Sequence, residues 1–307
     1  MFTTVMVPLD TSAIAERALP TAAAIAGAAG ATLRLVLVHE PIPGAGCPDA
    51  PWNAARSSME GAYLDGKAGE LSRTPGAHVT RERRVGPAAE TIADVATSSH
   101  ADLVVMTTHG RTGLSRAWLG SVADSIVRWA GVPVLMLRPS DDEAAPTTFR
   151  RVMIPLDESP RAECIVDSAV ALGGSNATYV LIEVVAPVPI MLSYADPYAM
   201  TATIADPEAT DRAVAEARKY LERVAQRLRA RGIASIEEHV VTADHAAPAL
   251  LHAAKAHNVD LIAIGTHGRG SSRLLLGSVA DKLLRGARTP LLVCRQPRAA
   301  GGAAASA

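Results

Sequence analysis

The stretch VMVPLD at residues 5–10 returns as VMIPLD at 152–157, an offset of 147 residues. Three further blocks repeat in the same order. THGR at 108–111 returns at 266–269, LGSVAD at 119–124 returns at 276–281, and VPVLMLR at 132–138 is echoed by TPLLVCR at 289–295. Ordered echoes at this spacing predict a tandem duplication of one domain, because solenoid repeats are only about 20 to 50 residues long.

Each copy alternates short apolar runs with Ala-rich helical stretches, which predicts a parallel sheet with helices on both faces. We therefore expect an α/β fold of two doubly wound domains, over 1–140 and 150–296, with a linker at 141–149 and a disordered tail at 297–307. The predicted strands are 3–9, 32–39, 77–85, 103–106 and 133–137 in copy one, and 150–156, 178–185, 236–242, 260–265 and 290–294 in copy two. The predicted helices of copy one are 12–29, 58–73, 87–99 and one from Ser121.

Proline placement predicts loops and one helix start. Residues 41–57 and 187–206 are rich in proline and are expected to be irregular. Asp206 and Pro207 fit the N-cap and first turn of a helix. The stripe of Val214, Ala217, Leu221, Val224 and Leu228 in that helix is expected to pack on its own sheet.

The composition argues against several classes of function. Hydrophobic residues make up 49% of the chain. The formal net charge is −1, which predicts no basic surface for nucleic acid or membranes. Three cysteines without ligand or redox spacing indicate a reduced protein, and neither a signal peptide nor a bilayer-spanning run is seen. We expect a cytoplasmic protein that binds neither nucleic acid nor membrane.

Two repeated features fall where predicted strands end, and ligands of open parallel sheets bind at such ends. Asp10 and Asp157 end the first strands. Each carboxylate could accept hydrogen bonds from a nucleoside or cap the following helix, and both readings stay open. Glycine-rich loops follow the fourth strands and would let backbone N–H groups approach an anion.

The helix after each loop begins near Gly120-Ser121 or Gly277-Ser278, where free N–H groups favour a phosphate. A capping box formed by Ser121 with Asp124, or by Ser278 with Asp281, is the alternative. The loops lack G-x-x-x-x-G-K-[ST] and so are not the usual nucleoside-triphosphate loop. His109 and His267 recur without metal-ligand spacing, so no metal or catalytic residue is predicted.

At these positions the chain resembles the universal stress protein family in its tandem two-domain form. The family signature is similar to G-x2-G-x9-G-[ST]. Copy one has Thr107 at the first glycine position, and copy two keeps Gly265 but is one residue shorter before Gly277. The resemblance implies strand order 3-2-1-4-5, pairing of the two domains through their fifth strands, and a homodimer.

The resemblance also implies ATP as the ligand, with Mg²⁺ held through the phosphates and adenine contacted by the backbone of Val38 and Val184. The predicted nucleotide-binding residues are Pro8, Leu9, Asp10, Val38, Thr107, Gly110, Arg111, Gly113, Gly120, Ser121 and Val122 in copy one, and Pro155, Leu156, Asp157, Val184, Gly265, Gly268, Arg269, Gly277, Ser278 and Val279 in copy two.

The favoured function is a nucleotide-dependent regulatory or stress-survival module whose protein partner is unknown. The alternatives are a slow ATPase on the same site and a structural relative that has lost nucleotide. No repeated carboxylate lies inside the loop to activate water, so the enzyme is the less favoured reading. Because copy one keeps the nine-residue spacing between Gly110 and Gly120, it is expected to hold ATP at least as tightly as copy two.

Overall fold

The fold was analysed in a computed structural model, which describes residues 2–40, 51–73, 76–108, 120–138, 145–192, 202–266 and 277–295. The chain forms two compact units. Of the described residues, the first unit holds those up to Thr148 together with 265–266, 277 and 291–295, and the second holds 149–264 and 278–290.

The sheet of the first unit confirms the predicted strand order for copy one. Its strands are β1 (Thr4–Leu9), β2 (Thr32–His39), β3 (His78–Val85), β4 (Leu103–Thr107) and β5 (Val134–Leu137). They follow the order β5-β4-β1-β2-β3, and the pairs among them are parallel. β12 (Leu291–Arg295) runs antiparallel beside β5 in this unit, with Leu292 opposite Leu135. The central strands are buried, as strands covered on both faces must be.

The helices of the first unit follow the predicted order, but they differ from the prediction in two places. They are α1 (Ala13–Glu16), α2 (Ala18–Ala29), α3 (Pro51–Leu71), α4 (Ala88–Ser98) and α5 (Ser121–Trp129). The predicted helix 12–29 is two helices that meet at Arg17. The prediction that 41–57 is irregular is wrong from Pro51 onward, because a proline in the first helical turn needs no N–H partner and begins α3 there.

The sheet of the second unit repeats this arrangement. Its strands β6 (Arg151–Leu156), β7 (Thr178–Val185), β10 (Ile236–Thr242) and β11 (Leu261–Thr266) follow the order β10-β7-β6-β11. All of these pairs are parallel. The backbone N–H of Ile262 donates to Pro290, and the hydroxyl of Thr266 donates to the carbonyl of Cys294. These bonds put β12 beside β11, so copy two also has the predicted order 3-2-1-4-5.

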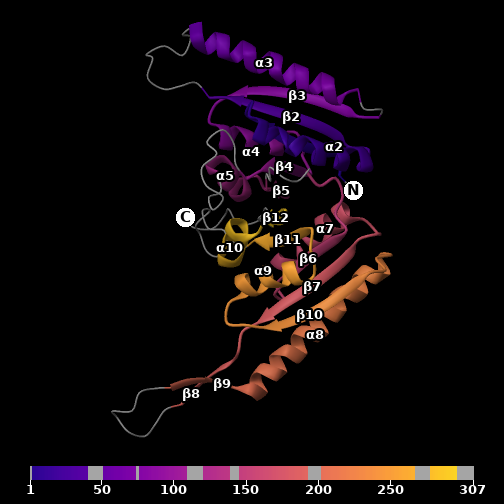
Figure 1. The fold of residues 1–307 in the computed structure, drawn as a ribbon, viewed down its shortest axis with the longest axis vertical. Coiled ribbons are helices and arrows are strands. Elements are labelled where there is room, and N and C mark those ends of the chain that lie inside the picture. The colour runs from indigo at the N-terminus through magenta and orange to yellow at the C-terminus, as the bar shows by residue number, and fades with distance from the viewer. Residues whose placement is uncertain are drawn as a thin grey trace, which may run out of the picture. The chain divides into compact units, whose positions relative to one another are not determined.

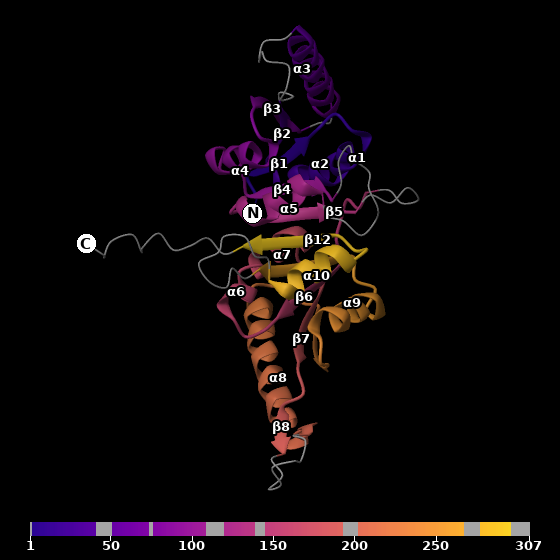
Figure 2. The ribbon, with the colours of Figure 1, turned by 90° about the vertical axis from the view of Figure 1, so that its left-hand side faces the viewer.

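The helices of the second unit are α6 (Pro160–Glu163), α7 (Val166–Gly173), α8 (Pro207–Ala230), α9 (Ala246–Ala256) and α10 (Ser278–Gly286). Asp206 caps α8 by accepting the N–H of Ala209, as predicted. α8 lies along β7 and β10 and buries four of the five predicted stripe residues against its own unit, while Val214 is half-buried (Figure 1 and Figure 2). None of the helices that the structure describes is both long and apolar enough to cross a bilayer.

The prediction that 187–206 has no regular structure is wrong at its two ends. β8 (Pro189–Leu192) and β9 (Ala202–Ala205) form an antiparallel pair before α8 (Figure 1). Pro189 is the first residue of its strand in a sheet of two strands, a position where a missing N–H costs no ladder bond. The proline count therefore misled the prediction, because it ignored where in a strand a proline is tolerated.

Candidate functional site

The candidate site of each copy lies where the strand order reverses, between the first and fourth strands. In copy one Val5 is opposite Leu103, and Asp10 and Thr108 each lie five residues further along. In copy two Val152 is opposite Leu261, and Asp157 and Thr266 lie at the same offsets. The two repeated aspartates thus reach the carboxyl edge beside the start of the glycine-rich loops, the crevice where open sheets bind ligands.

Asp10 and Asp157 have the same local hydrogen bonds. Oδ1 of Asp10 accepts from the Ser12 N–H at 3.0 Å and from its hydroxyl at 2.6 Å. Ser12 in turn is the N-cap of α1 and accepts the N–H of Ala15 at 3.1 Å. Asp157 and Ser159 repeat these contacts. The serine therefore caps the helix directly, and the aspartate holds that serine in place.

The residue after each aspartate has left-handed backbone geometry. Thr11 has φ +68° and Glu158 has φ +61°, although neither is glycine. Such geometry costs about 1–2 kcal/mol in a residue with a side chain and is often found at functional sites. Its presence at matching positions of both copies shows that the duplication kept this strained turn beside the aspartate.

The N-terminus of α5 reaches the end of β4. Gly120 is the N-cap and donates its N–H to the carbonyl of Thr108 at 2.9 Å. No side chain of the described residues caps the helix, and Asp124 accepts instead from Arg128 one turn further on, at 2.8 Å from both Nε and Nη2. Among the described residues the capping-box alternative is therefore not formed in α5, and the first N–H groups of such a helix suit an anion.

The corresponding helix of copy two, α10, begins at Ser278, and Asp281 likewise accepts from Arg285. Ser121 and Ser278 are both exposed, whereas Gly120, Val122, Gly277 and Val279 are half-buried. The two helix starts are thus accessible. Gly110, Arg111, Gly113, Gly268 and Arg269 lie outside the residues that the structure describes.

The remaining predicted residues lie on the strands around this edge. Pro8 and Leu9 are the last residues of β1, Pro155 and Leu156 are the last of β6, and Thr107 and Gly265 are buried in β4 and β11. Val38 and Val184 are half-buried near the ends of β2 and β7. The sequence also missed His39, the buried neighbour of Val38, whose Nδ1 lies 2.6 Å from Oε2 of buried Glu60.

Glu183 is the second residue that the sequence prediction missed. It lies in β7 opposite Leu156, is only 9% exposed, and its Oε2 has no hydrogen-bond partner among the described residues. Burial, followed by the nearby charges of Glu158 and Asp157, raises the pKa of Glu183 to about 7. The sequence did contain a signal for this residue. When Thr32 is aligned with Thr178, Glu183 falls at the position of Leu37 in copy one, which is apolar and buried.

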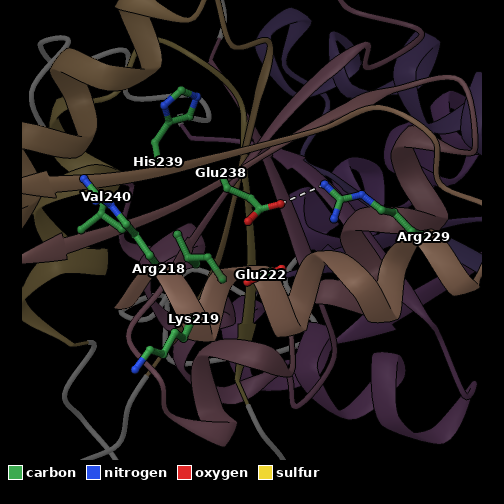
Figure 3. Close-up of a pocket in the computed structure, with 8 residues that line it drawn as sticks. Arg218, Lys219, Glu222, Arg229, Glu238, His239 and Val240 are labelled. Carbon is green, nitrogen blue, oxygen red and sulfur yellow. Dashed lines mark hydrogen bonds and ion pairs between the residues drawn. The ribbon is translucent and has the colours of Figure 1, made fainter. Parts of the chain in front are cut away.

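A separate open groove lies between α8 and β10. Arg218, Lys219, Glu222, Glu238 and His239 are among the residues that line it (Figure 3). Arg229 donates to Glu238 at 2.9 Å within it (Figure 3). Charges of both signs line the groove, so it offers no concentrated positive charge for a nucleotide.

Comparisons with known proteins cover both copies. The sequence model of the universal stress protein family matches residues 1–138 and 148–295. A universal stress protein of Mycolicibacterium smegmatis is 29% identical over 301 residues, 95% of this chain and 96% of that protein. One from Mycobacterium tuberculosis is 30% identical over 200 residues, 65% of this chain and 63% of that protein. The crystal structure of a universal stress protein from Archaeoglobus fulgidus matches with a TM-score of 0.69 at 17% identity, over 96% of this chain and 98% of that chain.

Proposed function

Because the chain belongs to the universal stress protein family, we propose that it binds ATP at the strand ends of its two copies and acts as a nucleotide-dependent regulatory module. The observation that carries this proposal is that Asp10 and the start of α5 lie at the ends of the neighbouring strands β1 and β4, where the strand order reverses. A nucleotide has the matching chemistry, because its phosphates suit a helix N-terminus and its hydroxyls suit a carboxylate.

Within each site the roles divide along the strand edge. The N–H groups at the start of α5 and α10 would bind phosphate, with Mg²⁺ held through the phosphates. Asp10 and Asp157 would accept from ribose or adenine. Val38 and Val184 would offer backbone groups to adenine. The cytoplasmic location and the homodimer remain predictions of the same proposal.

The experiment is calorimetric titration of the purified protein with ATP, preceded by mass identification of any nucleotide released on denaturation. Asp10→Ala and Asp157→Ala should each weaken binding in their own copy by roughly 10-fold or more, since a hydrogen bond to a charged group contributes about 1.5–3 kcal/mol. Ser12→Ala is the matched control, because it removes the helix cap and keeps the carboxylate. If Ser12→Ala lowers ATP affinity as much as Asp10→Ala does, the aspartate acts only through the turn and the proposal loses its main support.

Phosphate release separates the regulatory module from a slow ATPase. We expect bound ATP to persist without turnover above the protein-free background. Steady turnover that is lost in Asp10→Ala would favour the enzyme instead. Absence of both released nucleotide and ATP binding would favour a structural protein.

A further inference from the structure

The second unit holds a cluster of two histidines and a carboxylate at the opposite end of the sheet from the proposed ATP site. Glu237 and His239 are two residues apart near the start of β10, so they share one face of that strand. Figure 3 shows His239 leaving β10 on the side opposite Glu238, which faces α8. His257 is the C-cap of α9. One ligand atom from each of the three residues lies within 4.8 Å of the other two.

The polar atoms of this cluster converge without hydrogen bonding to one another. Nε2 of His239 is 3.6 Å and Nδ1 of His257 is 3.9 Å from Oε2 of Glu237, and the two imidazole centroids are 4.2 Å apart. These distances exceed the usual hydrogen-bond range. Nε2 of His239 is buried and has no hydrogen-bond partner among the described residues. A buried ring nitrogen left in that condition costs free energy, which a bound ion would offset.

We propose that Glu237, His239 and His257 bind a divalent transition-metal ion, with Zn²⁺ as the best match. Two imidazoles and one carboxylate form a three-ligand zinc set whose fourth position is taken by water. Tetrahedral bonds of about 2.0–2.1 Å place neighbouring ligand atoms about 3.3 Å apart. The separations of 3.6 Å and 3.9 Å from Glu237 are close to that value, and since all three ligand atoms lie within 4.8 Å of one another, the cluster would have to close around the ion. Mg²⁺ is a poorer match, because it prefers oxygen ligands in an octahedron.

Arg151 supports the cluster as an outer partner. Its Nη2 lies 3.0 Å from Oε1 and 2.8 Å from Oε2 of Glu237, and its Nε donates to the backbone carbonyl of His257 at 2.7 Å. The guanidinium therefore orients one ligand and anchors the segment that carries another, as outer-shell partners of metal ligands do. Each carboxylate oxygen has a second lone pair, so Glu237 can still bind an ion. The positive charge of Arg151 will make the affinity of the cluster for Zn²⁺ lower than it would be without a nearby positive charge.

Copy one provides an internal comparison. The strand registers align Thr80 with Glu237 and Glu82 with His239, and aligning Asp102 with Asp260 places Ser99 at the position of His257. Glu82 is instead paired with Arg34 at 2.8 Å. Copy one thus has no imidazole at the positions that match His239 and His257, and we expect one ion per chain, bound by copy two.

The test uses the full chain, stripped with a chelator and titrated with Zn²⁺ against a chromogenic competitor. A parallel titration with Co²⁺ reports the ligand geometry through its visible absorption. We expect one ion per chain and tetrahedral-type Co²⁺ bands. His239→Ala, His257→Ala and Glu237→Gln should each lower the affinity at least 10-fold, since even outer-shell partners contribute about 10- to 100-fold.

His100→Ala is the control, because it removes an exposed histidine one residue from Ser99 in copy one and should change nothing. Glu237→Gln keeps the shape of the side chain, so a loss of Zn²⁺ with an unchanged circular dichroism spectrum cannot be assigned to unfolding. Retention of wild-type Zn²⁺ affinity in all three variants would place the ion elsewhere and overturn the proposal. Failure of the wild-type chain to compete for micromolar Zn²⁺ would overturn it as well.

Discussion

Replacing Glu183 by Gln should stabilise the protein, and by an amount that grows with pH. The side chain lies within an otherwise apolar strand, is 9% exposed and faces the negative charges of Asp157 and Glu158. These surroundings raise the pKa of Glu183 from 4.5 to about 7. Glutamine keeps the size and shape of the side chain while removing its charge, so the substitution isolates the electrostatic cost.

The sign and size of the effect follow from the two pKa values of this carboxyl group. Between 4.5 in the unfolded chain and about 7 in the folded protein, the folded state holds the proton and the unfolded state has lost it. The free energy of unfolding contributed by Glu183 therefore falls as pH rises through this window, by about 1.4 kcal/mol per pH unit. Over the window from 4.5 to about 7 the total is on the order of 3 kcal/mol, absent below the window and complete above it.

The assay is urea or thermal denaturation of the wild-type protein and Glu183→Gln at about pH 5 and about pH 8, with calorimetry used to resolve transitions of different units. The stability advantage of the variant should be small at the lower pH and about 2 kcal/mol larger at the higher pH. Asp211→Asn, which removes an exposed carboxyl on α8, is the control for a general charge effect. An advantage of the same size at both pH values, or one that shrinks as pH rises, would refute the reasoning.

Three further predictions concern the scaffold around the sites. Ser12→Ala removes the cap of α1 and should lower the free energy of unfolding by about 0.5–2 kcal/mol in urea denaturation. Glu158→Gly relieves a positive φ and should raise the melting temperature, with a gain of about 0.5–1 kcal/mol; a lower melting temperature would contradict the strain. In Gly173→Ala the new Cβ would lie 2.6 Å from the Tyr179 hydroxyl and should cost about 1–3 kcal/mol. Gly27→Ala, where the added Cβ meets nothing within 4 Å, should be neutral or stabilising by up to about 1 kcal/mol in the same denaturation assay.

The fold could be predicted well from the sequence, because each element predicted in one copy could be compared with its counterpart in the other. The first and fourth strands are apolar blocks at matching positions of both copies, and the predicted order of strands was confirmed in each. The errors in secondary structure came from treating proline as a sign of irregular structure without regard to its position in a helix or strand. Pro51 begins a helix and Pro189 begins a strand, and in both places the lost N–H needs no partner.

The candidate site was predicted less completely, because its chemistry depends on tertiary neighbours. The repeat located Asp10 and Asp157, yet it could not tell that a serine two residues on would take the cap. The alignment of the two copies shows a charge at Glu183 where copy one has Leu37, but only the folded structure shows that this charge is buried near Asp157. Residues that repeat were thus predictable as site residues, whereas the role of a residue in which the copies differ follows only from its neighbours in the structure.

That difference bears directly on which copy binds ATP more tightly. Loop length predicts tighter ATP binding in copy one. The presence of Glu183 in copy two, where copy one has Leu37, is an independent electrostatic reason for the same ranking. Above pH 7 the buried carboxylate and Asp157 place two negative charges at one strand edge, where a triphosphate would add more. Copy two should therefore bind ATP more weakly as pH rises, while copy one should respond little. If Glu183→Leu, which restores the copy-one residue, leaves the pH dependence of ATP binding unchanged, the two copies differ for a reason other than this charge.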